Sequence, residues 1–164
     1  MVSMSDDTPP VRLRPVTGDE FDEWLPRQEA GYARLIAASG GMSAEAARKK
    51  AEQDTRRYFS GGFATPGQHV FRVMAGDVAV GWLWLGVPGP DPDPLMGWVF
   101  EIEIEPAFRG RGYGRAAMRL AEAEARSRGM TSLGLNVHGQ NTIARDLYES
   151  LGYEITAVQM KKPV

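Results

Sequence analysis

The chain contains no cysteine, and this absence removes several kinds of chemistry at once. Disulfide bonds, thiolate metal sites and a cysteine nucleophile are all excluded. Histidine is also scarce, with only His69 and His138 among 164 residues, so a histidine-rich metal site is not expected. We therefore predict a functional site that holds no metal ion.

Long apolar runs are missing as well. No segment approaches the roughly 20 apolar residues that a membrane-spanning helix needs, and residues 1–10 lack the apolar centre of a signal peptide. We expect a flexible tail at residues 1–10, a single domain over residues 11–164, a cytoplasmic location and no membrane partner. The net charge of -2 argues against non-specific binding to nucleic acid.

A glycine- and arginine-rich segment is the most informative part of the sequence. It follows a predicted strand, precedes a predicted helix, and consists of Arg109, Gly110, Arg111, Gly112, Tyr113, Gly114 and Arg115. Glycine lets the backbone approach a ligand closely, the N–H groups at a helix N-terminus attract anions, and arginine donors suit phosphate. We expect a pyrophosphate group to bind here.

Three nucleotide-binding patterns compete for this segment. A dinucleotide fingerprint fits Gly112-x-Gly114-x-x-Ala117, but its glycines should directly follow the strand, and residues 106–111 intervene. A nucleoside-triphosphate loop needs Gly-Lys-Ser/Thr, which is absent. The better match, Arg109-x-x-Gly112-x-Gly114, resembles the loop with which GNAT acyl-CoA N-acyltransferases hold the pyrophosphate of coenzyme A.

A second motif strengthens this resemblance. The pattern Asn141-x-x-Ala144-x-x-Leu147-Tyr148-x-x-x-Gly152-Tyr153 is similar to the other GNAT motif and places three residues near one helix face. The resemblance implies that Asn141 binds the cofactor, that Ala144 leaves room for it, and that Tyr148 protonates the leaving thiolate. From the residues alone, Asn141 is equally a helix N-cap and Tyr148 a packing residue.

The strand before the loop alternates acidic and apolar residues. Glu101, Glu103 and Glu105 should share one face, opposite Phe100, Ile102 and Ile104. Because clustered carboxylates raise one another's pKa, we predict Glu101 or Glu103 as a base for an ammonium acceptor, without separating the two. The alternatives are a solvated acidic face and simple attraction of a cationic substrate.

The patterns along the chain predict a mixed α/β fold. Strands are expected at residues 11–16, 70–75, 78–85, 98–105 and 131–137, and residues 153–162 are expected to form one strand or two short ones. Helices are expected after Thr17, after Ser43, over residues 113–128 and over residues 141–150. The resemblance implies a GNAT-like mixed sheet of six to seven strands flanked by about four helices, in which two parallel strands splay apart beyond a bulge.

The resemblance also implies an activity and a cofactor. We expect transfer of an acetyl group from acetyl-CoA to a primary amine of a small molecule or peptide, by direct attack. Backbone groups of Ile102 and Ile104 should contact the cofactor, with the N–H near Ile104, at the bulge, polarising the thioester carbonyl. The alternative is a non-catalytic acyl-CoA-binding module of the same fold. Strand edges near the short C-terminal end are compatible with a homodimer.

Overall fold

A computed structural model describes residues 10–89 and 93–164. The tail expected at residues 1–10 lies outside this range apart from Pro10, and the proline-rich loop at 87–94 is described only at its two ends. The chain divides into two compact units, one ending at Gly134 and the other comprising Leu135–Val164. The single domain over residues 11–164 stays a prediction.

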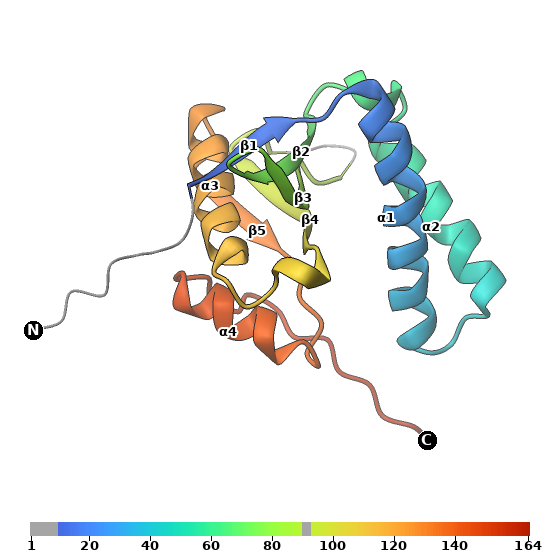
Figure 1. Ribbon diagram of the computed structural model, residues 1–164. Coiled ribbons are helices and arrows are strands. Elements are labelled where there is room, and N and C mark those ends of the chain that lie inside the picture. Colours follow the sequence, from blue (N-terminus) through green and yellow to red (C-terminus); the bar gives the residue numbers. More distant parts are fainter. Residues whose placement is uncertain (1–9, 90–92) are drawn as a thin grey trace, which may run out of the picture. The chain divides into compact units, whose positions relative to one another are not determined.

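The first unit is built on a mixed sheet whose strands follow their order in the sequence, β1-β2-β3-β4-β5 (Figure 1). The pairs β1–β2, β2–β3 and β3–β4 are antiparallel, and the pair β4–β5 is parallel. The elements are β1 (Val11–Pro15), α1 (Gly18–Ala38), α2 (Ala44–Tyr58), β2 (Gln68–Ala75), β3 (Val78–Gly86), β4 (Met96–Ile104), α3 (Tyr113–Ser127) and β5 (Ser132–Leu135), with single 3-10 turns at Gly62–Ala64 and Pro106–Phe108. This confirms the predicted mixed α/β class.

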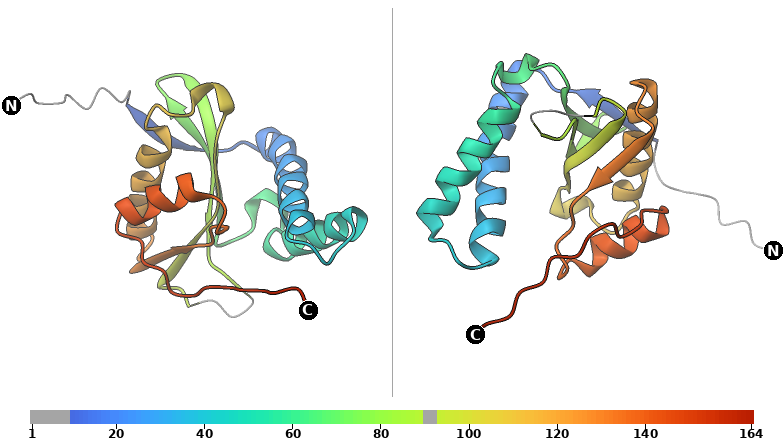
Figure 2. Two further views of the ribbon diagram at one scale, coloured as in Figure 1. Left: turned by 90° about the horizontal axis from the view of Figure 1, so that it is seen from below. Right: turned by 180° about the vertical axis from the view of Figure 1, so that it is seen from behind.

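The two long helices begin where the sequence predicts. Thr17 caps α1 in a capping box with Glu20, and Ser43 caps α2 by accepting from the Ala46 N–H. Pro26 lies inside α1 without ending it. The helices pack against each other and lie on one side of the sheet, while α3 lies on the other side (Figures 1 and 2). Each sheet face is therefore covered, and the two faces can differ in chemistry.

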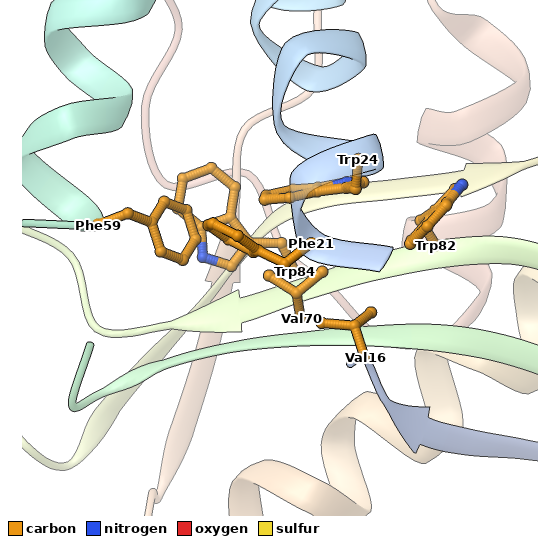
Figure 3. Close-up of a cluster of buried hydrophobic side chains, with 7 residues drawn as sticks. All are labelled: Val16, Phe21, Trp24, Phe59, Val70, Trp82 and Trp84. Carbon is orange, nitrogen blue, oxygen red and sulfur yellow. The ribbon is translucent and has the colours of Figure 1, made fainter. Parts of the chain in front are cut away.

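An aromatic cluster fills the space between α1, α2 and the sheet. Its buried members, shown in Figure 3, are Val16, Phe21, Trp24, Phe59, Val70, Trp82 and Trp84. Trp24 from α1 meets Trp84 from β3 edge-to-face, with ring centroids 5.6 Å apart. Because fully buried aromatic side chains supply much of the packing energy of a small domain, this cluster holds α1 firmly over the strands.

A bulge interrupts β4 at Phe100. Trp84 pairs with Glu101 and Leu85 pairs with Val99, so Phe100 has no partner residue on β3. Its ring stacks on Trp84 with centroids 4.3 Å apart, on the side of the sheet that carries Glu101. Two expectations are corrected here: the bulge lies at Phe100 rather than near Ile104, and Phe100 does not share a face with Ile102 and Ile104.

The second unit contains one helix, α4 (Thr142–Ser150), and a C-terminal segment. The strand expected at residues 153–162 is absent from this segment, so the described sheet has five strands rather than six or seven. Ile155, Val158 and Met160 of this segment are all exposed. A strand forms only where its side chains and backbone find a neighbouring strand, and the local sequence does not determine this.

Candidate active site

Three carboxylates on β4 and directly after its end face α1, and they have two kinds of hydrogen-bond partner. Glu101 accepts a hydrogen bond from the Trp24 indole, with Nε1 and Oε2 2.7 Å apart. Glu103 and Glu105 both accept from Arg27 Nη2, each at 3.0 Å. The alternating sequence thus does place the three acids on one side. The residues of α1 distinguish them, because Glu101 has an uncharged hydrogen-bond donor whereas Glu103 and Glu105 have a cationic one.

Glu101 is the carboxyl with the chemistry of a base. Burial raises its pKa to about 7, and repulsion from Glu103 adds to the rise. The hydrogen bond from Trp24 and the charge of Arg27 oppose this rise without cancelling it. A carboxyl that titrates near neutral pH can both accept a proton and release it to solvent, which is what a general base requires.

Glu105 has the opposite environment. The hydrogen bond from Arg27 lowers its pKa, with further help from the charge of Arg72. The buried Trp82 indole makes no complete hydrogen bond to a described residue, yet it lies near enough to Glu105 to lower the pKa in the same direction. Glu105 is therefore ionised at neutral pH and held by a cation, which makes it a poor base.

The second half of β4 offers its backbone on the side away from β3. Gly134 of β5 lies against the side chain of Trp98, near the start of β4. The strand β5 has only four residues and ends at Leu135, whereas β4 continues to Ile104. The Glu105 N–H donates to the Val80 carbonyl of β3. Because successive residues of a strand direct their N–H and C=O to opposite sides, the backbone groups of Ile102 and Ile104 point away from β3. They form an edge on which an extended chain can pair.

The loop after β4 is a distinct kind of site. Gly110 and Gly112 have φ of 74° and 83°, values that disfavour any residue with a Cβ, and Gly112 is the N-cap of α3. No side chain caps this helix, and no acidic residue lies in its first turn. The first backbone N–H groups of α3, beginning with those of Tyr113 and Gly114, therefore lie at a positive helix end that no acidic side chain of that turn neutralises.

Two arginines of the loop make contacts within the protein. Arg109 donates its Nε–H to the Ile104 carbonyl at 2.8 Å, which ties the loop back to β4. The Arg111 guanidinium lies over the Phe108 ring, 5.8 Å from its centroid. Tyr113 is buried, so its backbone rather than its hydroxyl is available for a ligand. The loop thus offers mainly backbone donors inside a positively charged frame.

The second unit carries the remaining predicted site residues. The Asn141 side chain accepts from the Ala144 N–H at 3.2 Å, which confirms its N-cap role for α4. Its amide NH₂ is a separate donor group. Tyr148 is half-buried, and burial raises its pKa above the usual 10. Its hydroxyl is therefore protonated at neutral pH and able to donate a proton.

Two residues that the sequence does not single out as functional hydrogen-bond the three carboxylates. The sequence assigns Trp24 only to the apolar stripe of the first helix, and it gives no role to Arg27. Arg27 follows Trp24 by one helical turn, so both face β4 once α1 lies across the strand. The three-residue spacing of Trp24 and Arg27 indicates that they share a helix face. Nothing in the local sequence indicates that this face contacts the acidic residues of β4.

Metal-binding clusters and membrane spans are both missing from the part of the chain that the structure describes. Over residues 10–89 and 93–164, no group of three or more histidine, aspartate or glutamate residues could hold a metal ion. Within the same described part of the chain, no helix is long and apolar enough to cross a membrane.

Comparison with models of known protein families identifies the family of this chain. The model of the acetyltransferase (GNAT) family matches residues 22–153. The chain therefore belongs to the GNAT family of acetyltransferases. This match includes the acidic strand, the arginine loop and the Asn141–Tyr148 motif. A comparison with curated proteins gives no significant match.

Solved structures give the same answer for the fold. YycN from Bacillus subtilis, provisionally assigned as an acetyltransferase, is 28% identical with a TM-score of 0.86, over 94% of this chain and 99% of that one. A GCN5-related N-acetyltransferase from Ralstonia eutropha is 22% identical with a TM-score of 0.65, over 94% and 99%. The aminoglycoside N-acetyltransferase AAC(6')-Iy, solved with CoA, is 16% identical with a TM-score of 0.59, over 95% of each chain. At these lower identities, the second and third structures support the fold alone.

Proposed function

We propose that this protein is an N-acetyltransferase that moves the acetyl group of acetyl-CoA to a primary amine. The observation that carries the proposal is the carboxyl of Glu101, held by Trp24 on a strand that is soon followed by a glycine loop and the uncapped start of α3. A base and a pyrophosphate site joined by one short segment suit a reaction between an amine and a CoA thioester. Family membership supports the same reaction class.

Coenzyme A fits the chemistry of the loop. Its pyrophosphate would accept from the N–H groups at the start of α3, where Gly110 and Gly112 permit close approach and no side chain caps the helix. Arg109, Arg111 and Arg115 would add positive charge. The extended pantetheine arm would pair with the backbone of Ile102 and Ile104, with Asn141 as a further donor and Ala144 leaving space.

The proposed chemistry needs no covalent enzyme intermediate. Ionised Glu101 takes a proton from the acceptor ammonium, directly or through water, and the neutral amine attacks the thioester carbonyl carbon. A C–N bond forms, and the C–S bond breaks. The Ile104 N–H polarises the carbonyl oxygen, and Tyr148 gives its proton to the departing thiolate. The second proton, which the attacking nitrogen loses as it becomes an amide, restores the Tyr148 hydroxyl. Glu103, the other candidate base, is paired with Arg27, and this favours Glu101.

The first experiment is calorimetric titration of the protein with acetyl-CoA, CoA and NADH. We expect binding of the two CoA species and none of NADH, followed by thiol release when amines are supplied. Binding of acetyl-CoA without turnover on a broad amine panel would favour a non-catalytic acyl-CoA-binding module. Failure to bind either CoA species would overturn the proposal.

A further inference from the structure

Arg27 forms an unusual bridge for a surface arginine. One guanidinium nitrogen, Nη2, donates to Glu103 of β4 and to Glu105, which directly follows the strand. The side chain of Arg27 is 40% exposed and those of Glu103 and Glu105 are 31% and 25% exposed. At such exposure the bridge adds little to the stability of the fold. Its main effect is on the local charge.

A second arginine acts on the same face. Arg72 of β2 lies over the Trp82 ring, 3.8 Å from its centroid, and Trp82 pairs with Glu103 on β4. The positive charge of Arg72 lowers the pKa of Glu105. The two carboxylates Glu103 and Glu105 are thus countered by two guanidiniums, one in direct contact and one close by. Glu101 has an indole N–H as its hydrogen-bond partner and no ion pair among the described residues.

We propose that Arg27 determines the charge class of the acceptor: it neutralises the acids beside Glu101 and so restricts the site to amines with a single positive charge. The proposal rests on the proposed function, since it names the substrate class of that same site. An acceptor such as an α-amino group or an isolated alkylamine brings one ammonium, which Glu101 can receive. A polyamine brings further ammonium groups to a face where Arg27 and Arg72 already supply the countercharge.

The physical reason is discrimination by repulsion. A site selects one ligand over another either by better contacts or by charges that penalise the competitor. Removing Arg27 would leave Glu103 and Glu105 without their shared partner, and the net charge of the face would become more negative by one unit. Two unit charges about 4 Å apart in bulk water change a binding equilibrium by about fivefold, and the effect grows where the protein displaces water.

The test compares three variants in binding, without relying on turnover. Butylamine and spermidine are titrated separately into wild type, Arg27→Gln, Arg27→Lys and Arg34→Gln, with NMR shifts as the readout. Arg34 is the matched control: it lies on the same helix and lines a groove formed by α1 and α2 alone, so Arg34→Gln removes the same charge elsewhere. We expect Arg27→Gln to bind spermidine about five- to tenfold more tightly, with butylamine little changed, and the other two variants to behave as wild type.

Two results would overturn the proposal. One is spermidine binding in Arg27→Gln that is no tighter than in wild type, and the other is an equal gain in Arg34→Gln, which would show a mere effect of net charge. Loss of Arg27 should also raise the pKa of Glu101, which Arg27 lowers; a purely structural role would not move that titration. Failure of the proposed function is separately visible, as absence of CoA binding or thiol release in wild type.

Discussion

The acidic face of β4 and the loop that follows it offer a ligand different chemical groups. On the strand these groups are side chains: Glu101 is buried against Trp24, and its neighbours are held by Arg27. In the loop they are the backbone N–H groups at the uncapped start of α3, which follows Gly110 and Gly112. The first region should therefore be sensitive to charge and the second to any added Cβ.

The largest expected effect comes from the loop. Gly112→Val places a β-branched side chain at a φ of 83°, where it is strained and where it would displace the N–H donors from the pyrophosphate. We expect acetyl-CoA to bind about 100-fold more weakly or worse, since losing two or three charge-assisted hydrogen bonds costs several kcal/mol. Calorimetric titration measures this.

Gly129→Val is the matched control. Gly129 follows the other end of α3 and has a φ of 82°, and a Cβ added there would meet no atom within 4 Å. The variant should therefore lose stability by a similar amount without losing affinity for acetyl-CoA. Equal weakening in both variants would show that the fold rather than the ligand depends on Gly112.

The next effect belongs to the acidic face and has opposite signs for activity and stability. Glu101→Gln should lower kcat about 100-fold, within the usual range for loss of a general base, because the amide still accepts from Trp24 but cannot take a proton. In the wild type, activity should rise with pH through about 7 as Glu101 ionises. The variant should lack that inflection.

Stability should change in the other direction. The folded state raises the pKa of Glu101 from 4.5 to about 7, so its contribution to stability is complete below about 4.5 and is lost as the pH rises through about 7. Glu101→Gln removes this loss and should be at least as stable as the wild type at about pH 8.5, well above that pKa, in thermal unfolding. A variant that is inactive because it is unfolded at that pH would contradict the assignment.

The two regions also differ in how far the sequence predicts them. The loop could be predicted because glycine, arginine and the start of a helix are neighbours along the chain. The acidic face was predicted only as an alternation, with Glu101 and Glu103 left equivalent. What separates them comes from α1, since Trp24 and Glu101 are 77 positions apart. The bulge at Phe100 and the absence of a strand at residues 153–162 depend on strand pairing, which the local pattern does not encode.

A smaller effect is expected from Tyr148→Phe, which tests whether a residue of the second unit acts on turnover or on binding. Because burial keeps its hydroxyl protonated, loss of the hydroxyl should lower kcat about tenfold or more and leave the affinity for acetyl-CoA nearly unchanged. Steady-state kinetics and calorimetry on the same sample measure both. Unchanged turnover would remove Tyr148 from the mechanism.

The smallest effect concerns Trp24, a positioning residue that acts through Glu101. Trp24→Phe keeps an aromatic ring in the cluster but removes the N–H that donates to Glu101 at 2.7 Å. Since this hydrogen bond lowers the pKa of Glu101, the inflection of the pH–rate profile should move upward by about one unit, with only a few-fold loss of kcat at its plateau. Trp84→Phe is the control, because Trp84 is buried in the same cluster and donates its N–H to Gln68 instead. Trp84→Phe should lower stability without moving the inflection of the pH–rate profile. An equal shift of the inflection in both variants would mean that the packing of the aromatic cluster, rather than the Trp24 hydrogen bond, sets the pKa of the base.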